Sequence, residues 1–179
     1  MNLAKWDMQG RRVFTISDIR KMFPDDQTDS FLVQLRLVAA GENPVIRRAC
    51  RGVYVNNRST RPKTDLIEEI ARTIRRGHHS YVSLESALSE HGWISQIPVG
   101  RLTVITTGRS GEFRTPWGDI EFTHTERPLA SFASDLVDIG RPLRMATPER
   151  ALTDLRRVGR NTHLVQPITE EEPDYAQLS

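Results

Sequence analysis

Arginine, glutamine and serine side chains gather in residues 29–55 of this 179-residue chain, a stretch that reads DSFLVQLRLVAAGENPVIRRACRGVYV. Its first part has the apolar spacing of an amphipathic helix, and its second part has two short β-like runs separated by arginines. Such side chains on a helix can read base edges in the major groove, while arginines on a hairpin can contact phosphates. We therefore expect a DNA-binding surface made of nine residues: Ser30, Gln34, Arg36, Arg47, Arg48, Arg51, Arg58, Arg61 and Lys63.

The charge distribution supports this expectation. The formal net charge is only +2, but residues 1–63 hold twelve Lys and Arg against six Asp and Glu, whereas the remainder is net acidic. Residues 45–63 contain six basic side chains and no acidic one. Such asymmetry is typical of a polyanion-binding segment joined to a body with a different role. The alternative is a helix and an edge hairpin with a solvated basic loop.

Side-chain patterns for catalysis or metal binding are weak by comparison. His78 and His79 are adjacent, so they do not converge on one metal from a helix or a strand. Asp119 and Glu121 share one face of a predicted strand, which suits a metal-dependent nuclease, but solvent-facing alternation explains them equally well. Cys50 is better explained as a small filler than as a nucleophile. We expect no catalytic residue, no cofactor and no metal site.

The elements around the basic stretch predict a winged helix-turn-helix in residues 1–57. Thr15 and Asp18 form a capping-box pattern before a helix that ends near residue 23, and a Pro-Asp-Asp turn follows. A second helix then ends before Gly41, and a basic hairpin completes the unit. Residues 56–63 are polar, basic and Pro-containing, and they are interpreted as a linker.

Residues 64–165 predict a second, mixed α/β domain with a small antiparallel sheet, so the fold class is α+β. The N-caps of its three helices are expected at Thr64, Ser83 and Thr147. Strands are expected at 102–106 and 119–123, joined by a longer hairpin or two turns, with an edge strand at 141–146. The acidic tail, residues 166–179, is expected to be disordered.

Several features suit a cytoplasmic protein. Apolar residues make up 37% of the chain, and no apolar run is long enough for a transmembrane helix. The N-terminal residues lack the apolar core of a signal peptide. A single cysteine excludes an intramolecular disulfide framework.

Three segments of the second domain carry a recognisable pattern: YVSLESALSEHG at 81–92, TGRSGEFRTPWG at 107–118 and ATPERALTD at 146–154. In this order they resemble the AbiEi family, the antitoxins of bacterial abortive-infection type IV toxin–antitoxin systems. The hairpin that ends R-G-V-Y at 51–54 is similar to that of the family's winged helix-turn-helix. The likeness extends over about residues 13–156.

The resemblance implies a non-enzymatic antitoxin that represses its own operon by binding operator DNA and counteracts a nucleotidyltransferase toxin encoded beside it, in phage defence. Antagonism through the toxin's target and direct binding of the toxin both remain open. Two copies are expected on repeated DNA half-sites, because one small domain buries a modest area. The alternative function is a stand-alone winged-helix regulator whose second domain senses a partner or a ligand.

Overall fold

The computed structural model describes residues 3–21, 28–95 and 100–165. These residues form helices together with an antiparallel and a mixed sheet, which confirms the α+β class. The predicted disordered tail, the Pro24–Asp26 turn and residues 96–99 lie outside the described part of the chain. The N-terminal elements are α1 (Leu3–Met8), β1 (Val13–Thr15), α2 (Ile16–Arg20), α3 (Thr28–Val38), β2 (Ile46–Cys50) and β3 (Val53–Asn56).

The N-terminal sheet has the strand order β1-β3-β2, and both strand pairs are antiparallel. Because side chains alternate across a strand, each strand contributes to two different layers. Phe14 of β1 and Ile46 of β2 are buried with residues of α1, α2 and α3. Val13 of β1 and Val55 of β3 are buried on the opposite face, in one cluster with residues of the following helix α4.

Helix α2 begins as its sequence predicts. The Thr15 side chain accepts a hydrogen bond from the backbone N–H of Asp18, and an Asp18 carboxylate oxygen accepts one from the Thr15 N–H. This reciprocal capping box satisfies two backbone donors that the first helical turn leaves without partners.

The elements of the second part, which we call the body, are α4 (Leu66–Ile74), β4 (Ser80–Val82), α5 (Leu84–Glu90), β5 (Arg101–Thr106), β6 (Gly111–Thr115), β7 (Gly118–His124), β8 (Leu136–Val137), β9 (Arg144–Ala146) and α6 (Pro148–Val158). Three 3₁₀ turns, Leu129–Ser131, Ala133–Asp135 and Thr162–Leu164, complete the described chain. The expected small antiparallel sheet is a six-stranded mixed sheet with the order β6-β7-β5-β4-β9-β8.

Two predictions about which strands lie next to each other in the sheet are wrong. β5 and β7 are parallel, and the hairpin instead joins β6 to β7, with the Thr115 hydroxyl donating to the Gly118 carbonyl at 2.7 Å. β5 is buried along five of its six residues, which requires a central position, whereas β6 alternates between half-buried and exposed residues and takes the edge. β9 is not an edge strand, because it lies between β4 and β8.

Only one of the three side-chain caps predicted for the body helices is present. Thr147 caps α6 through its side chain, with Pro148 in the first turn, as predicted. Asp65, rather than Thr64, precedes α4 and makes no side-chain cap. Ser83 precedes α5, but its side chain makes no cap either, because its hydroxyl bonds to a residue of α6.

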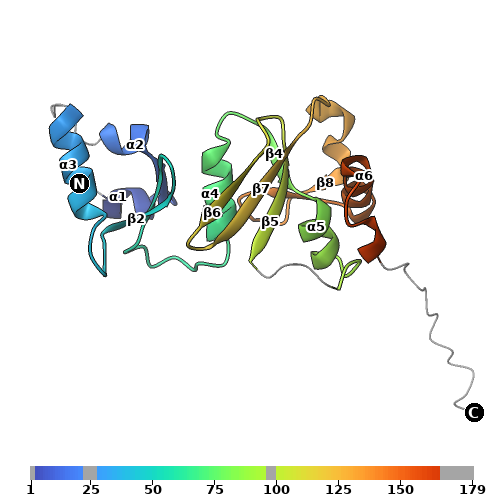
Figure 1. Cartoon of the computed structure of the whole chain (residues 1–179), viewed down its shortest axis with the longest axis horizontal. Coiled ribbons are helices and arrows are strands. Elements are labelled where there is room, and N and C mark those ends of the chain that lie inside the picture. The colour runs from blue at the N-terminus through green and yellow to red at the C-terminus, as the bar shows by residue number, and fades with distance from the viewer. Residues whose placement is uncertain (1–2, 22–27, 96–99, 166–179) are drawn as a thin grey trace, which may run out of the picture.

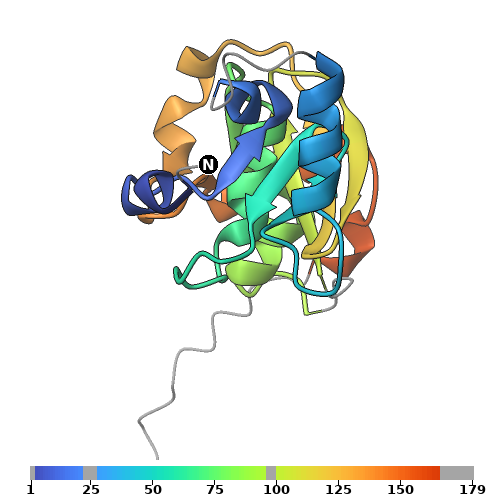
Figure 2. The same cartoon turned by 90° about the vertical axis from the view of Figure 1, so that its left-hand side faces the viewer.

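The helices and sheets stack as successive layers along the long axis of the molecule (Figure 1). Helix α4 lies between the N-terminal sheet and the body sheet, and α5 and α6 cover the other face of the body sheet. Figure 2, viewed from the N-terminal end, shows α3 in front of the N-terminal sheet, with the body behind them. Residues 56–63, interpreted from sequence as a linker, therefore connect two parts that share a hydrophobic cluster.

None of the helices in the described residues combines the length and the apolar composition that a membrane-spanning segment requires.

Candidate nucleic-acid interface

Helix α3 lies at the end of the molecule farthest from the body (Figure 1). Phe31 and Leu35 are buried and hold the helix on the N-terminal sheet. The opposite side presents Arg36 together with Val33 and Leu37, whose exposed fractions are 53% and 70%. A guanidinium beside apolar side chains suits a major groove, where Arg pairs with guanine and apolar groups contact thymine methyls. Ser30 and Gln34 belong to the same helix, but their side chains lie outside the described part of the structure.

The β2–β3 hairpin exposes all three of its arginines, Arg47, Arg48 and Arg51. Its turn is Arg51–Gly52, and Gly52 has a φ of +79°, a left-handed conformation that glycine adopts at little cost. The strand register shifts between Arg48 and Cys50, and Arg48 Nε donates to the Cys50 carbonyl at 3.2 Å. Arg48 and Arg51 are both exposed, so their charges are available to phosphates.

Arg47 has a different environment. Its guanidinium lies over the Trp117 ring, 5.6 Å from the centroid, and Trp117 belongs to the turn between β6 and β7 of the body. Such an exposed cation–π contact contributes about 0.5–1 kcal/mol. Arg47 therefore links the hairpin to the body, and the three predicted hairpin arginines do not form one uniform surface.

The residues that follow the hairpin are similarly divided. Arg58 and Lys63 are exposed, and neither side chain has a hydrogen bond or an ion pair within the described residues. Arg61 is half-buried, and its Nη1 donates to the Gly10 carbonyl at 2.7 Å and lies 3.6 Å from a Glu69 carboxylate oxygen. Arg61 therefore acts as a structural contact, while Arg58 and Lys63 remain available.

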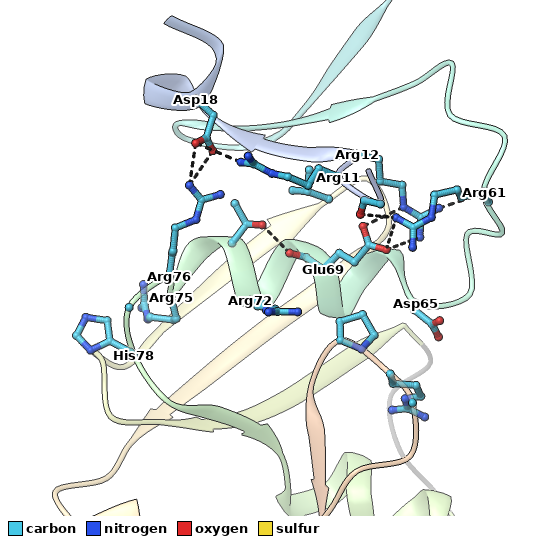
Figure 3. Close-up of a pocket in the computed structure, with 17 residues that line it drawn as sticks. Arg11, Arg12, Asp18, Arg61, Asp65, Glu69, Arg72, Arg75, Arg76 and His78 are labelled. Carbon is cyan, nitrogen blue, oxygen red and sulfur yellow. Dashed lines mark hydrogen bonds and ion pairs between the residues drawn. The ribbon is translucent and has the colours of Figure 1, made fainter. Parts of the chain in front are cut away.

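The contact between the N-terminal part and the body centres on an arginine outside the predicted set. Arg12 is only 2% exposed, and its Nε and Nη2 donate to the two Glu69 carboxylate oxygens at 3.1 and 3.0 Å. Its Nη1 donates to the carbonyls of Arg61 and Pro62. A bidentate pair of this kind fixes orientation as well as charge. Figure 3 shows Glu69 reaching from α4 toward Arg12 and Arg61.

Asp18 forms a second contact between these parts. In addition to capping α2, its carboxylate pairs with Arg76 at 2.8 Å and with Arg11 at 3.4 Å. Burial raises the pKa of Asp18, but the hydrogen bonds from Thr15 and Arg76 outweigh it and hold the pKa below its ordinary value. Asp18 is therefore ionised at neutral pH and anchors the C-terminal end of α4.

A cleft of about 870 Å³ lies between these contacts. Its wall includes Arg11, Arg12, Asp18, Arg61, Glu69, Arg72, Arg75, Arg76 and Arg141 (Figure 3). Most of these arginines already pair with carboxylates, whereas Arg72 is exposed and has no ion pair among the described residues. Sequence reasoning missed this constellation, since doublets such as Arg11–Arg12 and Arg75–Arg76 carry charge but do not identify a partner.

In the body, two of the three sequence motifs meet at one buried carboxylate. Asp154 is fully buried on α6, and its Oδ2 accepts hydrogen bonds from the Tyr81 and Ser83 hydroxyls, both at 2.9 Å. Its Oδ1 pairs with the Arg150 guanidinium. Burial, and then the charge of Asp154, raise the pKa of Tyr81, so its hydroxyl remains a donor at neutral pH. The motif residues therefore form a structural network.

One of the two carboxylates considered for a metal site, Glu121, is engaged in ion pairs. Glu121 is buried and pairs with Arg101 at 3.1 Å and with Arg160. Arg160 also pairs with Glu85 at 3.0 Å, so Glu121 belongs to an ionic cluster. Within the described residues, no three His, Cys, Asp or Glu side chains are placed to hold a metal ion.

Cys50 has the environment of an unreactive thiol. It is half-buried at the end of β2, and burial raises the pKa of its thiol despite the nearby charges of Arg48 and Arg75.

No family model and no curated protein matches this chain. The residues and contacts described above therefore carry the functional assignment.

Proposed function

We propose that this protein is a DNA-binding autorepressor and antitoxin of the AbiEi type. The observation that carries the DNA-binding half is the element order α1, β1, α2, α3, β2, β3 with β3 between β1 and β2. This order supports a winged helix-turn-helix in which α3 is the recognition helix and the β2–β3 hairpin is the wing. The exposed Arg36, Arg48 and Arg51 supply the charge such a unit needs on its outer surface.

In this proposal α3 enters the major groove and the hairpin contacts the adjacent backbone. Arg36 reads base edges, and the apolar Val33 and Leu37 contact thymine methyl groups. Arg48 and Arg51 bind phosphates, which contribute affinity and position but little sequence information. Two copies on repeated half-sites supply the contact area that one unit lacks.

The first prediction concerns the hairpin. A fluorescent duplex from the protein's own upstream region is titrated with the full chain at several salt concentrations and followed by anisotropy. The wild-type chain is expected to bind, with affinity falling steeply as salt rises. The double variant Arg48→Ala/Arg51→Ala is expected to bind about tenfold or more weakly, and its salt slope is expected to be smaller by about 1.8, because two phosphate contacts are lost.

Arg156→Ala is the matched control, because Arg156 is exposed on α6, on the opposite side of the body from the hairpin (Figure 1). It removes a positive charge without touching the proposed surface and should leave both affinity and slope unchanged. Unaltered binding by the double variant would overturn the wing assignment. A wild-type chain that fails to bind any duplex at low salt would overturn the DNA-binding function itself.

The antitoxin half rests on the resemblance of the body's three segments to the AbiEi family. Its support from geometry is that the segments at 81–92 and 146–154 meet at Asp154. The second prediction uses cells that express the neighbouring nucleotidyltransferase toxin together with the antitoxin. The full chain is expected to relieve growth arrest, and Arg48→Ala/Arg51→Ala is expected to relieve it equally while losing repression of an operon reporter.

This experiment separates the two candidate functions. If Arg48→Ala/Arg51→Ala loses repression but still relieves growth arrest, neutralisation of the toxin belongs to the body. If the wild-type chain represses the reporter but never relieves arrest, the antitoxin function fails and the stand-alone regulator, with a partner- or ligand-sensing body, takes its place.

A further inference from the structure

A second pocket, of about 710 Å³, opens on the body where α4 and β5 end. No Asp or Glu lines it. Its lining consists of three arginines, two histidines, two hydroxyl residues, an isoleucine and a glycine: Arg75, Arg76, Arg109, His78, His124, Thr107, Ser110, Ile74 and Gly108. We call it the loop pocket. A surface that gathers donors and positive charge without any carboxylate is suited to an anion.

Two of the loop pocket's arginines are not neutralised. Arg76 pairs with Asp18, but Arg75 has no ion pair within the described chain, and its Nε donates to the Arg109 carbonyl at 2.9 Å. The Arg75 guanidinium lies over the rings of Phe113 and Phe122, with distances to the centroids of 5.1 and 4.5 Å. The planar group is therefore fixed in orientation by the two rings and one carbonyl.

The charges around Arg75 also favour the binding of an anion. Burial lowers its pKa, and the charge of Arg109 lowers it further. Arg109 is exposed, and its side chain has no ion pair among the residues that the structure describes. Two neighbouring cations that repel each other without a carboxylate between them are stabilised when an anion binds both.

The loop that carries Arg109 is held in place by its neighbours. His124 Nδ1 donates to the Gly108 carbonyl at 2.7 Å, and the His124 backbone N–H donates to the Ser110 hydroxyl at 2.8 Å. The Ser110 hydroxyl proton therefore remains available to a ligand. A Cβ at Gly108 would lie 2.9 Å from Arg75 Cδ, so this glycine permits the close approach of the loop to α4.

The loop pocket is next to the hairpin. Strand β2 of the hairpin contacts β6 of the body, and a Cβ at Gly111, the first residue of β6, would lie 3.6 Å from Arg75 Nη2. This continuity favours the same kind of ligand for both surfaces. Phosphates along a DNA strand are spaced regularly, so a backbone that contacts the hairpin can continue onto a neighbouring basic site.

We propose that Arg75 and Arg109 of the body form a phosphate-binding site that holds a backbone phosphate of the DNA contacted by the hairpin. The DNA part of this inference rests on the proposed function. The same phosphate chemistry is offered by a free nucleotide, and the two sources are distinguished by separate binding measurements.

The test compares Arg109→Ala and Arg75→Met with the control Arg156→Ala, all in the full chain. Arg75→Met removes the charge but keeps an unbranched side chain for the contact with Phe113 and Phe122. In the first arm, a duplex of the upstream region is titrated at several salt concentrations. In the second arm, inorganic pyrophosphate is titrated by calorimetry.

We expect both pocket variants to bind the duplex several-fold more weakly, with a salt slope smaller by about 1 each. Arg156→Ala should match the wild type. If both variants match the wild type in both arms, the phosphate site is overturned. If they lose pyrophosphate binding but keep the wild-type duplex affinity and slope, the phosphate comes from a free ligand and the DNA contact is overturned. If no protein binds the duplex but pyrophosphate binding depends on Arg75 and Arg109, the proposed function fails and the phosphate site stands.

Discussion

Asp154→Ala is expected to lower the free energy of unfolding by about 3–5 kcal/mol, the usual cost of removing one partner of a buried ion pair. Arg150 is 7% exposed and would keep its charge without its carboxylate partner. The hydroxyls of Tyr81 and Ser83 would also lose their acceptor in a site closed to water. Urea unfolding followed by far-ultraviolet circular dichroism measures the loss.

Two variants show whether the effect comes from this network. Asp154→Asn keeps an oxygen acceptor for the hydroxyls but loses the charge, so it should cost less than alanine. Arg156→Ala, two residues further along α6 and exposed, should stay within about 0.5 kcal/mol of the wild type. A loss below about 1 kcal/mol for Asp154→Ala would contradict the interpretation that the two motifs are joined through this carboxylate.

Arg12→Ala is expected to cost about 3 kcal/mol or more and to weaken the junction between the N-terminal part and the body. The substitution leaves Glu69 without its bidentate partner and the carbonyls of Arg61 and Pro62 without a donor. Native-state hydrogen exchange should then show faster exchange for amides of β1 and β3, while amides of the central strand β5 change less.

The adjacent Arg11 provides the control. Its side chain is 45% exposed and pairs with Asp18 at 3.4 Å, so Arg11→Ala should cost less than about 1 kcal/mol. If Arg12→Ala and Arg11→Ala have equal effects, or if exchange accelerates equally in β1 and β5, the Arg12–Glu69 pair does not hold the two parts together.

Features that depend on neighbours in the sequence were predictable. The capping box of Thr15 and Asp18 and the Thr147–Pro148 start of α6 are confirmed, because each arises within a few residues of its own position. The acid-free basic stretch predicted where exposed basic side chains occur, and the structure exposes five of its six: Arg47, Arg48, Arg51, Arg58 and Lys63.

The partners of individual side chains followed from tertiary structure alone. Arg12 and Glu69 are 57 residues apart in sequence, and Ser83 and Asp154 are 71 apart. Nothing in the local pattern distinguishes the buried Arg12 from the exposed Arg11, or shows that Arg47 lies over Trp117.

The sequence by itself determined the helices with strong caps, the basic hairpin and the α+β class, since these depend on local conformational preference and on hydrophobic spacing. Only the tertiary structure decided that β5 and β7 are parallel, that the N-terminal sheet packs on α4 and that Arg75 and Arg109 meet in one acid-free pocket. The physical reason is that strand order and ion pairing depend on which distant surfaces exclude water together, and composition along the chain does not specify those surfaces.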